Sequence, residues 1–128
     1  MNDRRVDRVL AQLKEKGVSQ MILTDPSSIF YLTGKMITPG SRLLALYINE
    51  EGKHRLFVNR LFPMKEDLGV EVRWFSDTDD ICRMMADCTD HGLALGVDRK
   101  MTAEHLLALQ GLGAGSSYVN GSGCVNQV

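Results

Sequence analysis

The spacing of hydrophobic positions changes several times along this chain, and each change predicts a different element. Over residues 3–16 apolar side chains recur at i, i+3, i+4 and i+7, the pattern of a one-sided helix, and Gly17 follows as its stop. Residues 20–24 then form a short apolar run, which predicts a buried strand. The chain therefore opens with a surface helix followed by a strand.

Residues 25–34, Asp-Pro-Ser-Ser-Ile-Phe-Tyr-Leu-Thr-Gly, carry the most compact signal. Asp25 can accept backbone N–H bonds at the start of a helix, and proline has the φ that suits the first helical position. Gly34 can take the left-handed conformation that ends a helix. A short helix is therefore predicted, and its apolar side chains are expected to face a sheet, namely Ile29, Phe30, Tyr31 and Leu32.

Two apolar segments follow, and the turn between them predicts a hairpin. Residues 42–49 are too continuously apolar for a half-exposed strand, so we expect a central strand buried on both faces. Residues 50–53 have turn composition, and residues 54–59 return as the antiparallel partner. A short helix or helical turn, interrupted by Pro63, is expected over residues 60–68.

Strands and helices continue to alternate in the second half of the chain. The alternating residues 70–75 predict an edge strand, and residues 77–89 predict a helix capped by Ser76 or Asp77. Residues 122–128 show no pattern that would place them in the core. Residues 93–98 and 118–119 predict two further strands, and residues 103–112 predict a helix capped by Thr102.

This order of elements predicts an α/β fold, with a mixed sheet of about six strands and helices on both faces. A length of 128 residues fits one domain.

Composition and charge narrow the possible partners. The 15 basic and 16 acidic residues give a formal net charge of -1, so the chain lacks the basic excess that attracts nucleic acid or anionic lipid. No stretch is long enough to cross a bilayer, and the amino terminus has no secretory apolar segment, so a cytoplasmic location is expected. Cys82, Cys88 and Cys124 are odd in number and lack C-x-x-C spacing, which favours reduced thiols.

No catalytic or metal-binding motif is complete. The glycine-rich residues 111–117 follow a helix and lack both the third glycine of a dinucleotide fingerprint and a Walker lysine. His54, His91 and His105 have no metal-ligand spacing, and we interpret each as a solvated side chain.

Two aspartates end predicted strands, where α/β sheets often bind ligands, so acid–base or phosphoacceptor roles must be weighed for Asp25 and Asp98. Helix capping explains Asp25 without catalysis. A solvated ion pair with Arg99 or Lys100 is the corresponding interpretation of Asp98.

An apolar strand followed by D-P-x-x-I-x-Y-L-T-G resembles the opening of the amino-terminal domain of the creatinase, prolidase and aminopeptidase P family. Residues 25–34 carry the specific part of the match, and the rest is order and spacing. The resemblance implies that residues 1–121 are this domain and that residues 122–128 begin a linker to a missing pita-bread catalytic domain. In the family that second domain holds two divalent metal ions, expected here as Mn, Co or Zn, so the fragment itself is expected to be non-catalytic and without a cofactor.

The same resemblance implies partners and a site. The domain would join its own C-terminal catalytic domain, help to form a homodimer, and offer the loop of residues 35–42 to the active site of the neighbouring subunit. Lys35 and Arg42, at the ends of this loop, could meet the carboxylate of a proline-containing peptide substrate. Tyr31 is the third expected substrate-loop residue, and an ordinary solvated connection is the competing interpretation of the loop.

Two other hypotheses stay open. A free-standing α/β ligand-binding or protein-interaction module would recognise a small molecule at the strand ends. A receiver-like domain would use Asp98 or Asp25 as phosphoacceptor, although the other residues of such a site are not recognisable. A catalytic domain encoded beyond Val128 would favour the peptidase over the module.

Overall fold

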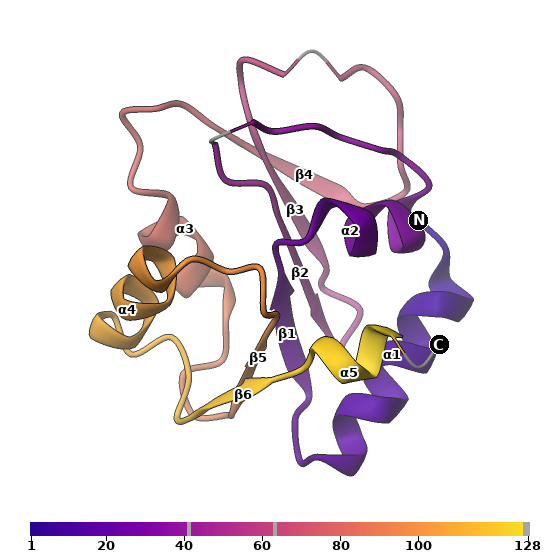
Figure 1. Ribbon diagram of the computed structural model, residues 1–128, viewed down its shortest axis with the longest axis vertical. Coiled ribbons are helices and arrows are strands. Elements are labelled where there is room, and N and C mark those ends of the chain that lie inside the picture. The colour runs from indigo at the N-terminus through magenta and orange to yellow at the C-terminus, as the bar shows by residue number, and fades with distance from the viewer. Residues whose placement is uncertain (41, 63, 127–128) are drawn as a thin grey trace.

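The chain folds around a single mixed sheet (Figure 1). The computed structural model describes residues 1–40, 42–62 and 64–126. Its strands, in chain order, are β1 (Gln20–Leu23), β2 (Ala45–Asn49), β3 (Arg55–Asn59), β4 (Glu71–Phe75), β5 (Leu95–Val97) and β6 (Tyr118–Asn120). Across the sheet they lie in the order β4-β3-β2-β1-β5-β6.

Strand directions confirm the predicted mixed sheet. β1 pairs antiparallel with β2 and parallel with β5, so it lies where the two directions meet. β2 and β3 form the predicted antiparallel hairpin, while β4 runs parallel to β3 and β6 runs parallel to β5. As predicted, β2 lies inside the sheet and β4 at its edge.

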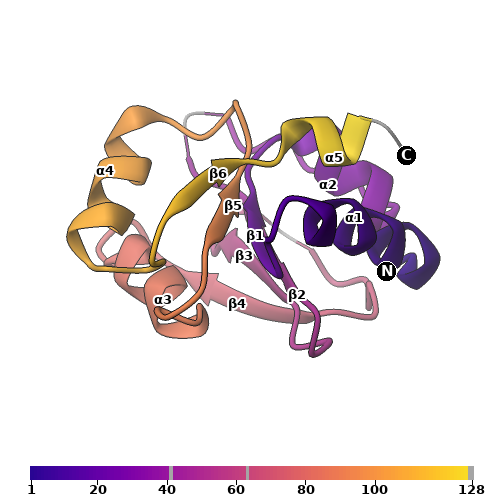
Figure 2. The ribbon, with the colours of Figure 1, turned by 90° about the horizontal axis from the view of Figure 1, so that it is seen from below.

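Helices cover both faces of the sheet, and the two views agree on their division (Figures 1 and 2). One face is covered by α1 (Asp3–Glu15), α2 (Pro26–Thr33) and α5 (Ser122–Asn126). The other face is covered by α3 (Ile81–Cys88) and α4 (Ala103–Gly111), which pack against each other. Among the described helices, none is long and apolar enough to cross a membrane.

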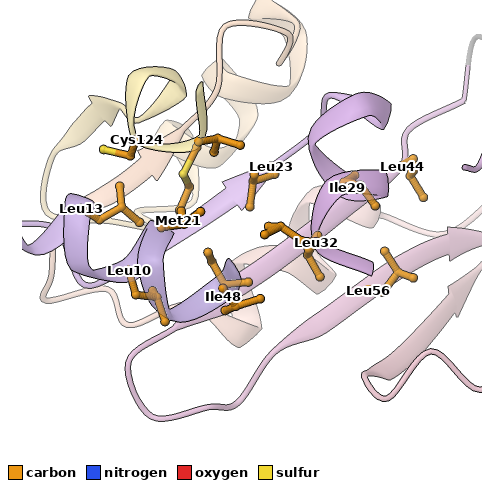
Figure 3. Packing of buried hydrophobic residues seen from close by; sticks show 14 of the residues in the cluster. Leu10, Leu13, Met21, Leu23, Ile29, Leu32, Leu44, Ile48, Leu56 and Cys124 are labelled. Atoms are coloured by element: carbon orange, nitrogen blue, oxygen red, sulfur yellow. The ribbon is translucent and has the colours of Figure 1, made fainter. Parts of the chain in front are cut away.

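Aliphatic side chains fill the space between the first group of helices and the sheet, as Figure 3 shows. Leu13 of α1, Leu32 of α2 and Cys124 of α5 belong to one buried cluster with Met21 and Ile48 of the central strands. Gly121 lets the chain pass close to this cluster, because a Cβ there would lie 2.9 Å from the sulfur of Met21.

The short helix α2 forms as the sequence predicts. The Asp25 carboxylate accepts a bond of 3.0 Å from the Ser27 N–H, and Gly34 ends the helix with a φ of 81°. Ile29 and Leu32 are fully buried against the sheet, but the expectation for Phe30 is wrong, because its side chain is 46% exposed. A helix turns only one stripe toward a sheet, and Phe30 lies beside that stripe.

Residues 60–68, for which a short helix or helical turn is predicted, form no helix in their described part. Described residues of this segment form a turn at residues 60–61 followed by a connection without regular secondary structure, and Pro63 lies outside them. Phe62, Met64 and Leu68 pack half-buried against the core without a helical arrangement. Proline inside such a helix removes a hydrogen bond, so a connection that buries these side chains individually replaces it.

The predicted start of α3 also needs correction. Asp80, not Ser76 or Asp77, caps the helix, and its carboxylate accepts a bond of 3.1 Å from the Arg83 N–H. Asp79 closes the preceding turn by accepting from the Ser76 N–H at 2.8 Å. Several neighbouring acidic residues could cap this helix, and the sequence does not show which of them binds another partner instead.

The carboxyl-terminal residues belong to the core, contrary to the sequence expectation. Residues 122–126 form α5, which packs on α1, and Cys124 and Val125 are buried. Because α5 has only five residues, it shows no periodicity from which a buried face could be predicted.

Candidate functional site

The loop over residues 35–42, which the sequence predicts to reach substrate, is attached to the rest of the domain by two exposed ion pairs. Lys35 Nζ lies 2.8 Å from Glu66 Oε1 in the β3–β4 connection. Arg42 binds both carboxylate oxygens of Asp77 through Nε and Nη2, each at 3.1 Å. Residue Ser41 of this loop lies outside the described residues.

These contacts lower the pKa values of the two carboxyl groups that take part in them. Hydrogen bonds from Arg42 and from Asn59, whose Nδ2 donates at 2.8 Å, lower the pKa of Asp77. The hydrogen bond from Lys35 likewise lowers the pKa of Glu66. All four charged groups are substantially exposed, so such pairs contribute little stability and exchange partners readily.

Tyr31 makes a different contact. The Arg5 guanidinium lies 4.3 Å from the centre of the Tyr31 ring, and Arg5 Nη1 donates to the Tyr31 carbonyl at 2.8 Å. Tyr31 therefore connects α2 to α1. Lys35 and Arg42 line two separate pockets and Tyr31 lines neither of them, so the structure does not bring the three predicted residues together.

Asp98 is the largest departure from the sequence interpretation, because its side chain is only 6% exposed. Oδ2 accepts from the backbone N–H groups of Thr24 at 2.7 Å and Asp25 at 2.9 Å. Oδ1 accepts from the Thr24 hydroxyl at 2.7 Å and the Met101 N–H at 3.1 Å. The predicted solvated ion pair is wrong, since Asp98 joins the ends of β1 and β5.

A pocket of about 330 Å³ opens at these strand ends. It is bounded by Thr24 and Pro26 after β1, by Lys100 and the start of α4 after β5, and by residues 39, 40 and 42–44. Sequence reasoning missed the contributions of Lys100, Thr102 and His105, although polar residues after two apolar runs were visible. The missing information was that β1 and β5 are neighbours.

A second pocket, of about 200 Å³, lies between the 35–42 loop and the β3–β4 connection. Apart from Lys35 and Thr38, its lining is apolar, namely Met36, Ile37, Val58, Phe62 and Met64. Met36 is 50% exposed, so this hollow is open to the surface.

Within residues 1–40, 42–62 and 64–126, no three His, Cys, Asp or Glu side chains come together as a metal-binding set, so a two-metal centre does not fit the residues described. Cys82 and Cys124 are buried and Cys88 is half-buried; all three are free, and burial raises the pKa of each thiol. Buried thiols with a raised pKa are unreactive.

The histidines contact backbone and hydroxyl groups. His54 Nδ1 accepts from the Asn49 N–H at 3.3 Å, and His91 Nε2 lies 2.7 Å from the Ala86 carbonyl oxygen. His105 Nδ1 lies 2.8 Å from the Thr102 hydroxyl, at the rim of the pocket at the ends of β1 and β5. The three histidines therefore lie at separate places in the fold.

Sequence comparison identifies the family. Residues 5–128 match the profile of the Creatinase/Prolidase N-terminal domain, and the chain belongs to this family. An uncharacterized peptidase of Staphylococcus saprophyticus is 35% identical over 57 residues, which are 44% of this chain and 16% of that peptidase.

Solved structures show the same fold. The N-terminal domain of an X-Pro dipeptidase from Streptococcus pyogenes superposes over the full length of both chains with a TM-score of 0.80 and 20% identity. Dipeptidase PepE from Mycobacterium ulcerans matches 98% of this chain with a TM-score of 0.77 and 27% identity. The match covers 36% of that dipeptidase, so this chain spans about a third of its length.

Proposed function

We propose that this chain is the non-catalytic amino-terminal domain of a metal-dependent Xaa-Pro dipeptidase- or aminopeptidase P-like peptidase. The observation that carries the proposal is the match to PepE, which includes nearly all of this chain but only 36% of the longer dipeptidase. The part of such an enzyme that is absent here would hold the catalytic residues and the two metal ions. The family membership of residues 5–128 supports the same division.

In this proposal the domain shapes the substrate cleft through the loop of residues 35–42. Lys35 or Arg42 would bind a substrate carboxylate in the active site of a neighbouring subunit, in a homodimer. Arg42 supports this role because its Nη1 has no hydrogen bond among the described residues, while Nε and Nη2 hold the side chain on Asp77. Lys35 would have to leave Glu66, which costs little free energy because the ion pair is exposed.

The position of α5 supports a connection to a following domain. Residues 122–126 run along α1 and end on the face covered by α1 and α2 (Figure 1). We propose that the linker to the catalytic domain begins after this helix, with the domain boundary displaced accordingly from residue 121. The partner of first importance is then the protein's own catalytic domain.

The test compares residues 1–128 with the longer protein that contains the following domain. With Mn²⁺ or Co²⁺ added, we expect the longer protein to cleave an Xaa-Pro dipeptide and residues 1–128 to show no cleavage above the metal-only background. Comparable cleavage by both proteins would contradict the proposal, and so would a longer protein without any peptidase activity.

The loop is tested in the same assay. Arg42→Gln in the longer protein should raise KM for a dipeptide with a free carboxylate, whereas Lys53→Gln, in the β2–β3 turn, should leave KM unchanged. Equal kinetics for the Arg42→Gln variant and the unmodified protein would exclude substrate contact by Arg42.

A further inference from the structure

The pocket of about 330 Å³ at the ends of β1 and β5 lies where two neighbouring parallel strands send their connections to opposite faces of the sheet. β1 continues into α2 on one face, and β5 continues into α4 on the other. In open α/β sheets this arrangement leaves a crevice outside the strand ends, and small ligands bind there. Its volume of about 330 Å³ is at the lower end of the range for small-molecule sites, about 300–1,000 Å³. The pocket therefore has the position and the size of a site for a small ligand.

One part of the pocket is apolar. Pro26, Pro39, Leu43 and Leu44 contribute to its lining. Leu44 is buried and Leu43 packs half-buried on the core, so the structure beneath holds both side chains in place. An apolar group of a ligand would displace water from this surface, which is favourable.

The remaining part holds two cationic side chains, Lys100 and Arg42, of which Arg42 is ion-paired with Asp77. Lys100 is exposed and has no ion pair in the part of the chain that the structure describes. Arg42 is oriented by Asp77 through two of its nitrogens and keeps Nη1 for another acceptor. None of the described lining residues is acidic. The Asp98 carboxylate lies behind Thr24 and already accepts four hydrogen bonds. Both of its oxygens are therefore occupied by donors of the protein itself.

His105 adds a ring N–H at the rim. The Thr102 hydroxyl accepts from the His105 backbone N–H at 3.3 Å, which leaves its own proton to donate to Nδ1 at 2.8 Å. In that arrangement the ring proton is on Nε2, because a neutral imidazole carries one proton. The rim thus offers N–H donors from three side chains, and a carboxylate accepts from several donors at once.

We infer that this pocket binds a small carboxylate that carries an apolar group. The carboxylate would lie against Lys100 and Arg42 Nη1, and the apolar group against Pro26 and Leu43. A free apolar amino acid, or a short peptide that ends in one, has this chemistry. The site lies within this chain, so it would be present in residues 1–128 alone. In the longer protein Arg42 Nη1 would serve either this ligand or the substrate carboxylate of a neighbouring subunit, not both at once.

The experiment is an NMR titration of residues 1–128 labelled with ¹⁵N. N-acetyl-L-leucine should shift the backbone amides of Thr24, Gly40, Lys100 and Thr102. N-acetyl-L-leucinamide lacks the charge and acetate lacks the apolar group, so each should bind about fivefold or more weakly. Equal binding of the amide or of acetate, shifts confined to another surface, or no shifts at all would overturn the inference.

A pair of lysine variants assigns the contact. Lys100→Gln should weaken the binding of N-acetyl-L-leucine by about fivefold, since one charge-assisted hydrogen bond is lost at a partly exposed site. Lys53→Gln is the matched control, because Lys53 is also exposed and lies in the β2–β3 turn, at the opposite ends of the strands. The same spectra report whether each variant is folded. Unchanged affinity for Lys100→Gln, or an equal loss in both variants, would overturn the assignment.

Discussion

At the scale of single residues, Asp98 shows how neighbours in sequence can mislead. Arg99 and Lys100 follow it directly, but both are exposed, and the aspartate turns inward to accept hydrogen bonds from Thr24, Asp25 and Met101. A buried carboxylate is stable only when its oxygens are satisfied by donors. Asp98 therefore acts as a connector between two loops that are more than 70 residues apart.

We expect Asp98→Asn to destabilise the domain by about 2–3 kcal/mol. Each carboxylate oxygen accepts from two donors, so the amide nitrogen of asparagine would face two N–H or O–H groups wherever it is placed. Urea unfolding followed by circular dichroism measures the loss. Asp87→Asn, at an exposed position of α3, is the control and should change stability by less than about 0.5 kcal/mol. Equal stability of the two variants would show that Asp98 is not such a connector.

His54 predicts a dependence of stability on pH. The half-buried ring has a lowered pKa, chiefly because burial disfavours the charged form, and its neutral Nδ1 accepts from the Asn49 N–H. The unfolded chain then binds a proton near the ordinary histidine pKa of about 6.5, while the folded domain binds it only at lower pH. Stability contributed by neutral His54 is thus present above about pH 6.5 and is lost as the pH falls toward the lowered value.

The measurement is the chemical shift of the His54 ring protons against pH, together with urea unfolding at about pH 7.5 and 5.5. We expect a pKa below 6.5 and a smaller loss of stability on acidification in His54→Gln than in the unmodified domain. A His54 ring that titrates at or above the ordinary value, or an equal pH dependence in both proteins, would contradict this account.

At the scale of elements, local capping signals proved reliable where one residue had one task. Asp25 caps the start of α2 and Gly34 its end, and Thr102 caps the start of α4, as the sequence predicts. Where several polar residues competed, contacts from elsewhere in the chain decided. Asp77 binds Arg42 and Asn59, so the start of α3 falls to Asp80.

The helix α5 provides a prediction at this scale. Val125→Ala should cost about 1.5–2.5 kcal/mol, because two buried methyl groups are removed from the cluster between α5 and α1. Leu107→Ala is a useful control, since Leu107 of α4 is 64% exposed and its truncation should cost less than about 0.5 kcal/mol. Thermal unfolding compares the two variants. A Val125 variant as stable as the Leu107 variant would mean that α5 does not contribute to the core.

At the scale of the whole molecule, the sheet order creates the pocket at the ends of β1 and β5. β1 is flanked by β2 and β5, although β5 lies far along the chain, and the pocket forms because α2 and α4 leave on opposite faces. The residues at its rim were visible in the sequence as a loop, a strand end and a helix cap. Their convergence was not, because strand adjacency depends on contacts between distant segments.

The amino-acid order alone was sufficient for the α/β class, the β2–β3 hairpin, the ends of α2 and the family resemblance, because periodicity, caps and turns act over a few residues. Tertiary structure was needed for the sheet order, for the burial of Asp98, Cys124 and Val125, and for the separation of Tyr31, Lys35 and Arg42. Each of these features is a free-energy balance between groups far apart in the chain, where burial and hydrogen bonding to a distant partner outweigh the local preference of a residue.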